Sequence, residues 1–149
     1  MDKTLSSGDL LATYNFKVEL GGITRAGFKE CSGLESTIGA VKYREGTDPT
    51  LAQRQLPGLQ SVSNIVLKRG ISQDNALWEW HKQAIEGKVT RRDISIVLRD
   101  DQGNDKIWWN VKNCWPTKWS GPTLDATSES TAIETLELAH EGISVQSWK

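Results

Sequence analysis

The sequence predicts a mainly β protein, a small antiparallel β-barrel or sandwich with one flanking α-helix and a long extended hairpin arm. Apolar and polar residues alternate along roughly seven short segments, as they do in strands with one buried face. A helical period of apolar residues occurs once, within residues 74–87. Residues 43–62 follow neither period and contain two prolines and two glycines. Such long irregular connections are uncommon inside compact domains and usually bind something or are disordered.

The chain is long enough for one domain and too short to suggest two. Its 149 residues are 37% hydrophobic, so a single domain over residues 1–149 is expected, with residues 1–12 as an N-terminal extension. The 18 basic and 19 acidic residues leave a formal net charge of −1. This balance gives no general attraction toward nucleic acid or an anionic membrane.

Segments for export or membrane insertion are not evident. No apolar run approaches the roughly 20 residues that a membrane helix needs, and the first residues lack the apolar core of a signal peptide. No stable membrane insertion is therefore expected. Two cysteines, Cys31 and Cys114, in a chain with a sizeable core are expected to be reduced, buried thiols. Together these features predict synthesis in the cytoplasm.

The first half of the chain is predicted to form two hairpins. Alternation from Tyr14 to Leu20 predicts the first strand, and Gly21-Gly22 predicts a turn into a second extended run over residues 23–36. Residues 38–45 and 61–68 are expected to be the strands that lead into and out of the irregular segment. That segment is therefore the tip of an extended hairpin.

One helix is expected, between the two halves of the chain. Asp74 is the predicted N-cap, and Gly87 is predicted to stop the helix. The residues that share its less polar face are Leu77, Trp80, His81, Ala84 and Ile85. No other segment has a convincing helical period.

The second half of the chain is predicted to form another hairpin and a long final strand. Alternation over residues 93–100 predicts a strand, and the turn DDQGND leads into a partner strand, KIWWNVKNCW. Residues 121–130 are expected to be an irregular loop. The last strand, residues 131–148, is expected to bend near Glu141-Gly142.

No constellation of catalytic residues stands out. Nucleophilic catalysis needs a base beside the nucleophile, and the only histidines are His81, on the predicted helix, and His140, on the last strand. A lone histidine is more often structural, so no catalytic residue is predicted and the chain is not expected to be an enzyme. The sequence has no CxxC, HxH or HExxH spacing for a metal and no GxxxxGK[ST] phosphate loop. Neither a metal nor a cofactor is expected.

Four tryptophans in the second half of the chain invite a binding function. Trp108, Trp109, Trp115 and Trp119 are interleaved with lysines, and on a small barrel such rings stack bases or sugars. Alternation, however, places Trp109 and Trp115 on the apolar face with Val111, where large aromatic residues form cores and interfaces. Core and subunit packing is therefore favoured. The alternative is a monomeric aromatic-lined β-barrel that binds single-stranded nucleic acid or glycan.

Several segments resemble a known family in their order and spacing. They are CSGLES, VKYREG, NIVLKRG, RRDISIVLRD, NVKNCWPTKW and ATSESTAIETLELAHEG. Over residues 13–146 the chain resembles the tail tube proteins of contractile-tailed phages and, more closely, the inner tube proteins of phage-tail-like contractile injection systems. The haemolysin-coregulated protein of type VI secretion is similar but more distant. The resemblance implies a small β-barrel with a flanking helix, no known active site, and subunits that form six-fold rings stacked into a hollow tube inside a contractile sheath.

The resemblance gives residues 43–62 a role, because in this family the corresponding hairpin reaches the neighbouring ring. Its polar side chains would form charged and hydrogen-bonded contacts there, while its apolar ones would be buried against the next subunit. The expected inter-ring contact residues are Arg44, Glu45, Asp48, Leu51, Gln53, Arg54, Gln55, Leu56, Pro57 and Leu59. The polar face of the first strand, formed by Asn15, Lys17 and Glu19, is a candidate for the lumen wall.

The resemblance also implies partners and a location. Copies of the same chain would form the hexameric rings and the tube, and the further partners expected are a sheath protein, baseplate or spike proteins and tube-terminating proteins. Cargo or DNA would occupy the lumen. The chain would be assembled into a phage virion tail or a phage-tail-like particle that is cytoplasmic, membrane-anchored or released. Its role would be passive, because the sheath stores and releases the energy.

Overall fold

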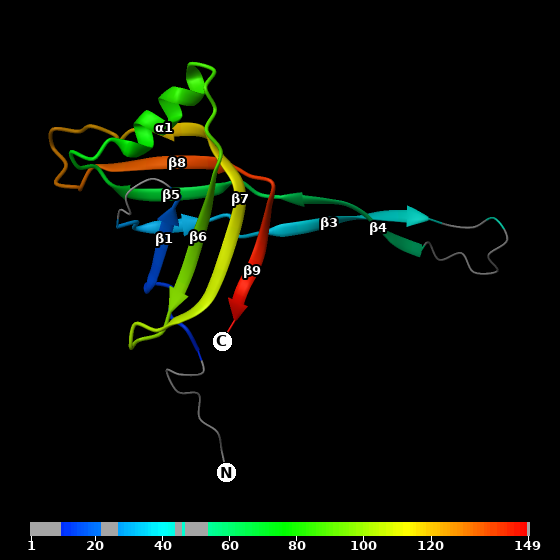
Figure 1. Cartoon of the computed structure of the whole chain (residues 1–149). Coiled ribbons are helices and arrows are strands. Elements are labelled where there is room, and N and C mark those ends of the chain that lie inside the picture. The colour runs from blue at the N-terminus through cyan, green and yellow to red at the C-terminus, as the bar shows by residue number, and fades with distance from the viewer. Residues whose placement is uncertain (1–9, 22–26, 44–45, 47–53, 149) are drawn as a thin grey trace, which may run out of the picture.

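The computed structural model describes residues 10–21, 27–43, 46 and 54–148 of the chain. This part forms a β-rich body flanked by one helix, from which a two-stranded ribbon projects (Figure 1). The elements are β1 (Phe16–Leu20), β2 (Glu30–Ser32), β3 (Ser36–Tyr43), β4 (Arg54–Val62), β5 (Ile65–Gly70), α1 (Ala76–Ile85), β6 (Arg92–Arg99), β7 (Asp105–Ser120), β8 (Ile133–Ala139) and β9 (Gly142–Trp148). The predicted class, mainly β with one helix and an extended hairpin, is confirmed.

The long strand β7 joins two groups of antiparallel strands. Its first half pairs with β6 and β9, and β1 extends this group beyond β6. Its second half pairs with β8, which continues through β5 to β2. Figure 1 shows β5 and β8 running across the direction of β1 and β6. In the part of the chain that is described, β1 and β2 are the two ends of this order and do not pair, so closure into a barrel is not observed.

The core lies between the inward faces of these strands and α1. Val18 lies opposite Ile96 across the β1–β6 ladder, and both side chains are buried. Leu77 and Trp80 pack α1 against the same core, while the Trp80 Nε1–H donates a hydrogen bond to the Thr90 carbonyl at 2.7 Å. Burying a side chain of the size of Leu77 stabilises the fold by about 1.5–3 kcal/mol. Other members of the cluster are Leu20, Ile65, Leu67, Ile94, Val111, Cys114, Leu136 and Leu138.

A β-bulge in β7 changes which residues face the core. Asn113 has a φ of 53°, and its backbone N–H donates to Asp93 Oδ1 at 2.9 Å. Beyond it the buried positions shift from Val111 to Cys114, because a bulge inserts one extra residue into the alternation. Trp109 packs against the core as predicted, but the prediction that Trp115 shares the face of Val111 is wrong.

The predicted opening hairpin is also wrong. The first strand, β1, pairs with β6, 74 residues or more away in sequence, and the Gly21 N–H continues this ladder by bonding the Asp93 carbonyl at 3.2 Å. The second extended run contributes β2, which pairs with β5. Alternation defines which face of a strand is buried, and it does not define the neighbouring strand. The apolar faces of β1 and β6 match each other, so both are buried by the long-range pairing.

The helix is shorter than its sequence pattern indicates. Its N-cap is Asn75, which makes no side-chain capping bond. The predicted cap, Asp74, lies one residue earlier, and its Oδ1 accepts the Ala76 N–H at 3.0 Å, a local turn that aspartate favours. The helix ends before Gly87, as predicted, where φ is +84°. Ile85, expected on the buried face, is exposed.

Two predicted strands are each divided. The strand expected at residues 61–68 becomes the end of β4 and the start of β5, separated by Ser63 and Asn64. The final strand becomes β8 and β9, and the break lies at His140 and Glu141, beside the predicted bend. Residues 121–130 contain neither helix nor strand, as expected.

Candidate assembly site

Strands β3 and β4 form a separate two-stranded sheet, here called the ribbon. All eight residues of β3 are exposed. At about 3.4 Å per residue, β3 alone extends roughly 24 Å, and Figure 1 shows the ribbon leading away from the body. The ribbon therefore presents a surface that its own domain leaves uncovered.

Part of the segment that was expected to be irregular is a strand, because β4 begins at Arg54. Pro57 lies opposite Ala40 beside a bulge, and proline is tolerated at edge strands and bulges. A Cβ on Gly58 would lie 2.9 Å from the Gly39 carbonyl oxygen, so glycine permits the close approach of the two strands. Proline and glycine are unusual in strands, but Pro57 and Gly58 both fit the geometry of the ribbon.

The predicted contact residues fall into two groups. Arg44, Glu45, Asp48, Leu51 and Gln53 lie outside the described residues. Arg54, Gln55, Leu56, Pro57 and Leu59 lie along β4. The Leu59 side chain is 90% exposed, and Leu56 is exposed opposite Val41 of β3. Ile38 and Val41 are also exposed on the ribbon; they were expected on the strand that leads into the irregular segment and not among the contact residues.

The root of the ribbon is tied to the body by several bonds. The Ser63 hydroxyl donates to Glu35 Oε2 at 2.9 Å, and the Ser63 carbonyl lies 2.7 Å from His140 Nε2. Gly33 has a φ of +95°, and a Cβ there would lie 2.0 Å from the Asn64 carbonyl oxygen. The two connections between ribbon and body therefore pack directly on each other, and His140 has a structural role at this corner.

The predicted lumen residues lie on the first strand and just before it. Because Val18 and Leu20 face the core, Lys17 and Glu19 face outward from β1. The Lys17 Nζ lies 3.4 Å from Glu19 Oε1 and 3.6 Å from Asp105 Oδ2. The carbonyl of Asn15 accepts the backbone N–H of Arg99 at 2.8 Å, so this residue extends the β1–β6 ladder.

Polar side chains on the outward face of β1, β6, β7 and β9 contact one another. Asn110 Oδ1 accepts hydrogen bonds from the Ser95 hydroxyl at 3.0 Å and from Trp108 Nε1–H at 3.1 Å. Asn110 Nδ2 donates to Gln146 Oε1 at 2.8 Å. Lys17 Nζ lies 5.8 Å from the centroid of the Trp108 ring. Polar groups on this face thus satisfy one another within the subunit.

The four tryptophans that invited a binding function, Trp108, Trp109, Trp115 and Trp119, do not gather on one surface. Trp108 belongs to the polar face, whereas Trp109 and Trp119 pack against the core. The indole N–H of Trp119 donates to Glu134 Oε1 at 2.9 Å. An aromatic stacking groove for bases or sugars needs several rings on one side, and this arrangement does not provide one.

A buried ion pair connects the helix start to the sheet. Arg69 Nε lies 2.8 Å from Glu134 Oε2, and both side chains are almost fully buried. The same guanidinium lies 3.3 Å from Asp74 Oδ2. Since Glu134 also accepts the Trp119 N–H, the pair has the additional hydrogen bonds that a buried charge requires.

The remaining reactive groups have structural surroundings. Burial raises the pKa of the Cys31 thiol to about 12, with a further contribution from the Glu30 charge. Burial also raises the pKa of the Cys114 thiol to about 12, with a further contribution from the Asp93 charge. His81 Nδ1 lies 3.3 Å from the Pro116 carbonyl oxygen. Within the described residues, no group of three or more His, Cys, Asp or Glu is placed to hold a metal. No described helix is both long and apolar enough to cross a membrane.

A β-rich body that projects an exposed ribbon has the architecture of a self-associating structural subunit. The chain belongs to the T4-like virus tail tube protein gp19 family, whose model matches residues 12–144. It is therefore a structural tail tube protein.

Solved structures of contractile injection systems contain similar chains. A chain of the PVC sheath–tube complex in the extended state is 28% identical, with a TM-score of 0.85 over 97% of this chain and 99% of that one. A chain of the anti-feeding prophage tube-terminating cap is 30% identical, with a TM-score of 0.83 over 99% of this chain and 96% of that one. Hcp1 from Flavobacterium johnsoniae shares the fold at 15% identity, with a TM-score of 0.55 over 89% and 95% of the two chains. No curated protein sequence matches the chain.

Proposed function

We propose that this chain is the subunit of the hollow inner tube of a phage-tail-like contractile injection system, in which hexameric rings stack and sheath contraction drives the tube through a target envelope. The ribbon is the observation that carries the proposal, since it projects exposed apolar side chains away from a tail tube domain. Stacked rings meet head to tail, and such contacts repeat indefinitely when they do not close. A projecting ribbon supplies one half of this contact through Arg54, Gln55, Leu56, Pro57 and Leu59.

The partners follow from the same assignment. Similar chains occur in a sheath–tube complex and in a tube-terminating cap, which supports a sheath protein and a terminating protein as neighbours of this tube. Baseplate or spike proteins would hold its other end. The subunit has no enzymatic role in this proposal: the sheath supplies the energy, and the tube transmits the thrust within a phage-tail-like particle.

The polar face of β1, β6, β7 and β9 is our candidate for the lumen wall, with Asn15, Lys17 and Glu19 on it. Lys17 is paired with Glu19 and Asp105, so its charge is balanced within the subunit. A wall without a strong net field lets charged cargo or DNA slide, whereas a single-sign surface would hold it.

Shortening the ribbon tests the proposal. Residues 39–59 are replaced by Asn-Gly, which joins Ile38 to Gln60, a pair that already lies opposite in the ladder, by a turn suited to hairpins. The body should remain folded by circular dichroism, because the ribbon is separate from the seven-stranded sheet. Negative-stain microscopy should show rings or single subunits in place of tubes. Long normal tubes from the shortened protein would refute the role of the ribbon.

A point substitution with a matched control refines this test. Leu59→Glu places a charge on the ribbon, and Ile85→Glu places the same charge at a second exposed aliphatic residue, 65% accessible at the end of α1. Tubes should be lost or shortened only for Leu59→Glu. Equal effects of the two variants would contradict a specific ribbon contact, and a wild-type protein that forms neither rings nor tubes would contradict the proposed function itself.

A further inference from the structure

An open cavity of about 420 Å³ lies at one end of the body. Its lining comes from the segment that follows β5, the start of α1, the end of β7 and the start of β8. The residues are Ile71, Ser72, Asp74, Asn75, Trp78, Trp119 and Glu134. Four separate elements therefore converge on this one hollow.

The accessible surface of the cavity is mainly apolar, although four of its lining residues are polar or charged. The rings of Trp78 and Trp119 meet edge to face with their centroids 5.0 Å apart. Ile71 is 42% exposed and Trp78 is 38% exposed, although residues of this kind are usually buried. The N–H of Trp119 is already bonded to Glu134. Concave sites with aromatic walls and few polar groups bind apolar ligands or side chains.

The charge around the cavity is negative. The cluster beneath it contains Asp74 and Glu134 against Arg69 alone, which leaves one net negative charge. The backbone N–H of Ala76 is the main cause that lowers the pKa of Asp74, so this carboxylate is ionised at neutral pH. In contrast, Lys42, on β3 of the ribbon, is basic. Complementary charge favours contact between the two surfaces.

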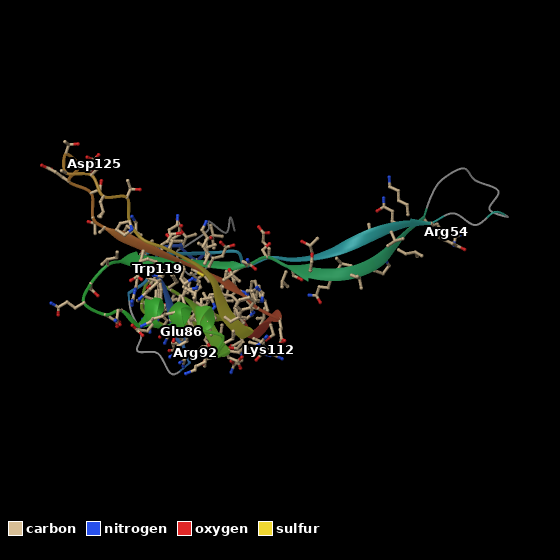
Figure 2. All side chains as sticks on the ribbon, turned by 90° about the horizontal axis from the view of Figure 1, so that it is seen from above. Arg54, Glu86, Arg92, Lys112, Trp119 and Asp125 are labelled. Carbon is tan, nitrogen blue, oxygen red and sulfur yellow. The ribbon has the colours of Figure 1, made fainter. Side chains whose placement is uncertain are left out.

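The ribbon and the cavity lie at opposite ends of β5. The ribbon joins the N-terminal end of β5 through Ser63 and Asn64, and the cavity begins with Ile71, directly after the C-terminal end. Figure 2 shows Arg54 at the outer end of the ribbon and Asp125, in the loop beside this region, at the far end of the molecule. A ribbon therefore points away from its own cavity, whereas a copy shifted along β5 would bring its ribbon toward it.

We propose that the cavity formed by Ile71, Trp78 and Trp119 receives the ribbon of a second copy of this chain. The exposed Val41 and Leu56, directly opposite each other across the ribbon, provide the apolar side chains that enter it. This inference rests on the proposed tube function and adds the receiving half of the contact. A knob at one end and a socket at the other define a heterologous, head-to-tail interface.

Disulfide trapping tests the contact directly. The variant Leu56→Cys with Ser72→Cys carries one thiol on the ribbon and one in the cavity, and the control, Leu56→Cys with Ser128→Cys, carries the second thiol on the loop of residues 121–132. Mild oxidation of preassembled protein with copper phenanthroline should give a ladder of linked subunits for the cavity variant and none for the control. The native thiols are poorly reactive, because Cys114 is buried and Cys31 is partly buried, and the pKa of each is raised to about 12. A ladder from the control alone would place the ribbon elsewhere and overturn the inference.

A charge substitution provides a second readout. Trp78→Lys puts a cation in the cavity, where it would oppose Lys42 of the entering ribbon, and Ile85→Lys puts the same charge further along α1. Trp78→Lys should abolish tubes while circular dichroism stays unchanged, and Ile85→Lys should assemble normally. Normal tubes from Trp78→Lys, or no ladder from the cavity variant while the wild-type protein forms tubes, would overturn the inference and leave the proposed function standing. A wild-type protein without tubes would instead remove the proposed function.

Discussion

Removal of the Glu134 carboxylate should destabilise the subunit more than any surface charge substitution. In Glu134→Ala, the guanidinium of Arg69 stays buried and loses its 2.8 Å partner. Breaking a buried ion pair from one side costs roughly 3–5 kcal/mol, because the remaining charge is left uncompensated. Arg69 still contacts Asp74 at 3.3 Å, so the loss is expected near the lower end, about 3 kcal/mol.

An exposed ion pair offers the matched control. Lys68 Nζ lies 3.1 Å from Glu30 Oε2, with side-chain exposures of 42% and 53%. Exposed pairs contribute about 0–1 kcal/mol, so Glu30→Ala should hardly change the free energy of unfolding. Both substitutions remove one carboxylate from a strand of the same group, and they differ chiefly in burial.

The assay is urea unfolding of the subunit with the shortened ribbon, which keeps assembly from contributing to the measured stability. Tryptophan fluorescence follows the transition, since Trp80 is buried in the core and becomes exposed on unfolding. The double variant Arg69→Met with Glu134→Leu should recover most of the loss, because apolar residues of similar volume often replace a buried pair at little cost. A loss below about 1 kcal/mol for Glu134→Ala, no larger than an exposed pair contributes, would refute the reasoning.

Two further predictions concern titratable groups. The backbone N–H groups of Asn104 and Gln102 hold the pKa of Asp100 below its usual 3.8; the stabilisation is therefore present above pH 3.8 and is lost as the pH falls through the lower pKa of the folded state. Asp100→Asn should flatten the fall of the melting temperature over this acid range, and an unchanged slope would contradict the assignment. Burial raises the pKa of Cys31 and Cys114 to about 12, so iodoacetamide at mildly alkaline pH should modify the folded protein slowly and the urea-unfolded protein rapidly; equal rates would be evidence against buried thiols.

The faces of the strands were predictable from the sequence, and their partners were not. Val18 and Leu20 identify the buried face of β1 by alternation alone, yet their neighbours on β6 lie far along the chain. The bulge at Asn113 is equally hidden, because the residue with the positive φ donates its backbone N–H to the Asp93 carboxylate on the neighbouring strand. Local periodicity carries no information about such contacts.

The assembly surfaces were predictable in part. The departure of residues 43–62 from any period identified the hairpin, whereas Val41, on the strand leading into it, was not among the predicted contact residues although it is exposed on the ribbon. The cavity had no sequence signal, because Ile71, Trp78 and Trp119 come together only through the crossing of several elements. The pair of Arg69 and Glu134 is separated by 65 residues, and spacing along the chain cannot indicate a contact of that range.

The root of the ribbon has a mechanical consequence. Only Ser63 and Asn64 separate β4 from β5, so tension on the ribbon passes through two residues of backbone into β5. That strand is bonded along one side to β2 and along the other to β8, and Figure 1 shows the ribbon leaving roughly along its direction. A pull along a strand loads its ladder bonds in shear, all at once, whereas a pull across it would open them one after another. The subunit is thus anchored through a strand that is bonded on both sides, in the direction in which that strand resists extraction best.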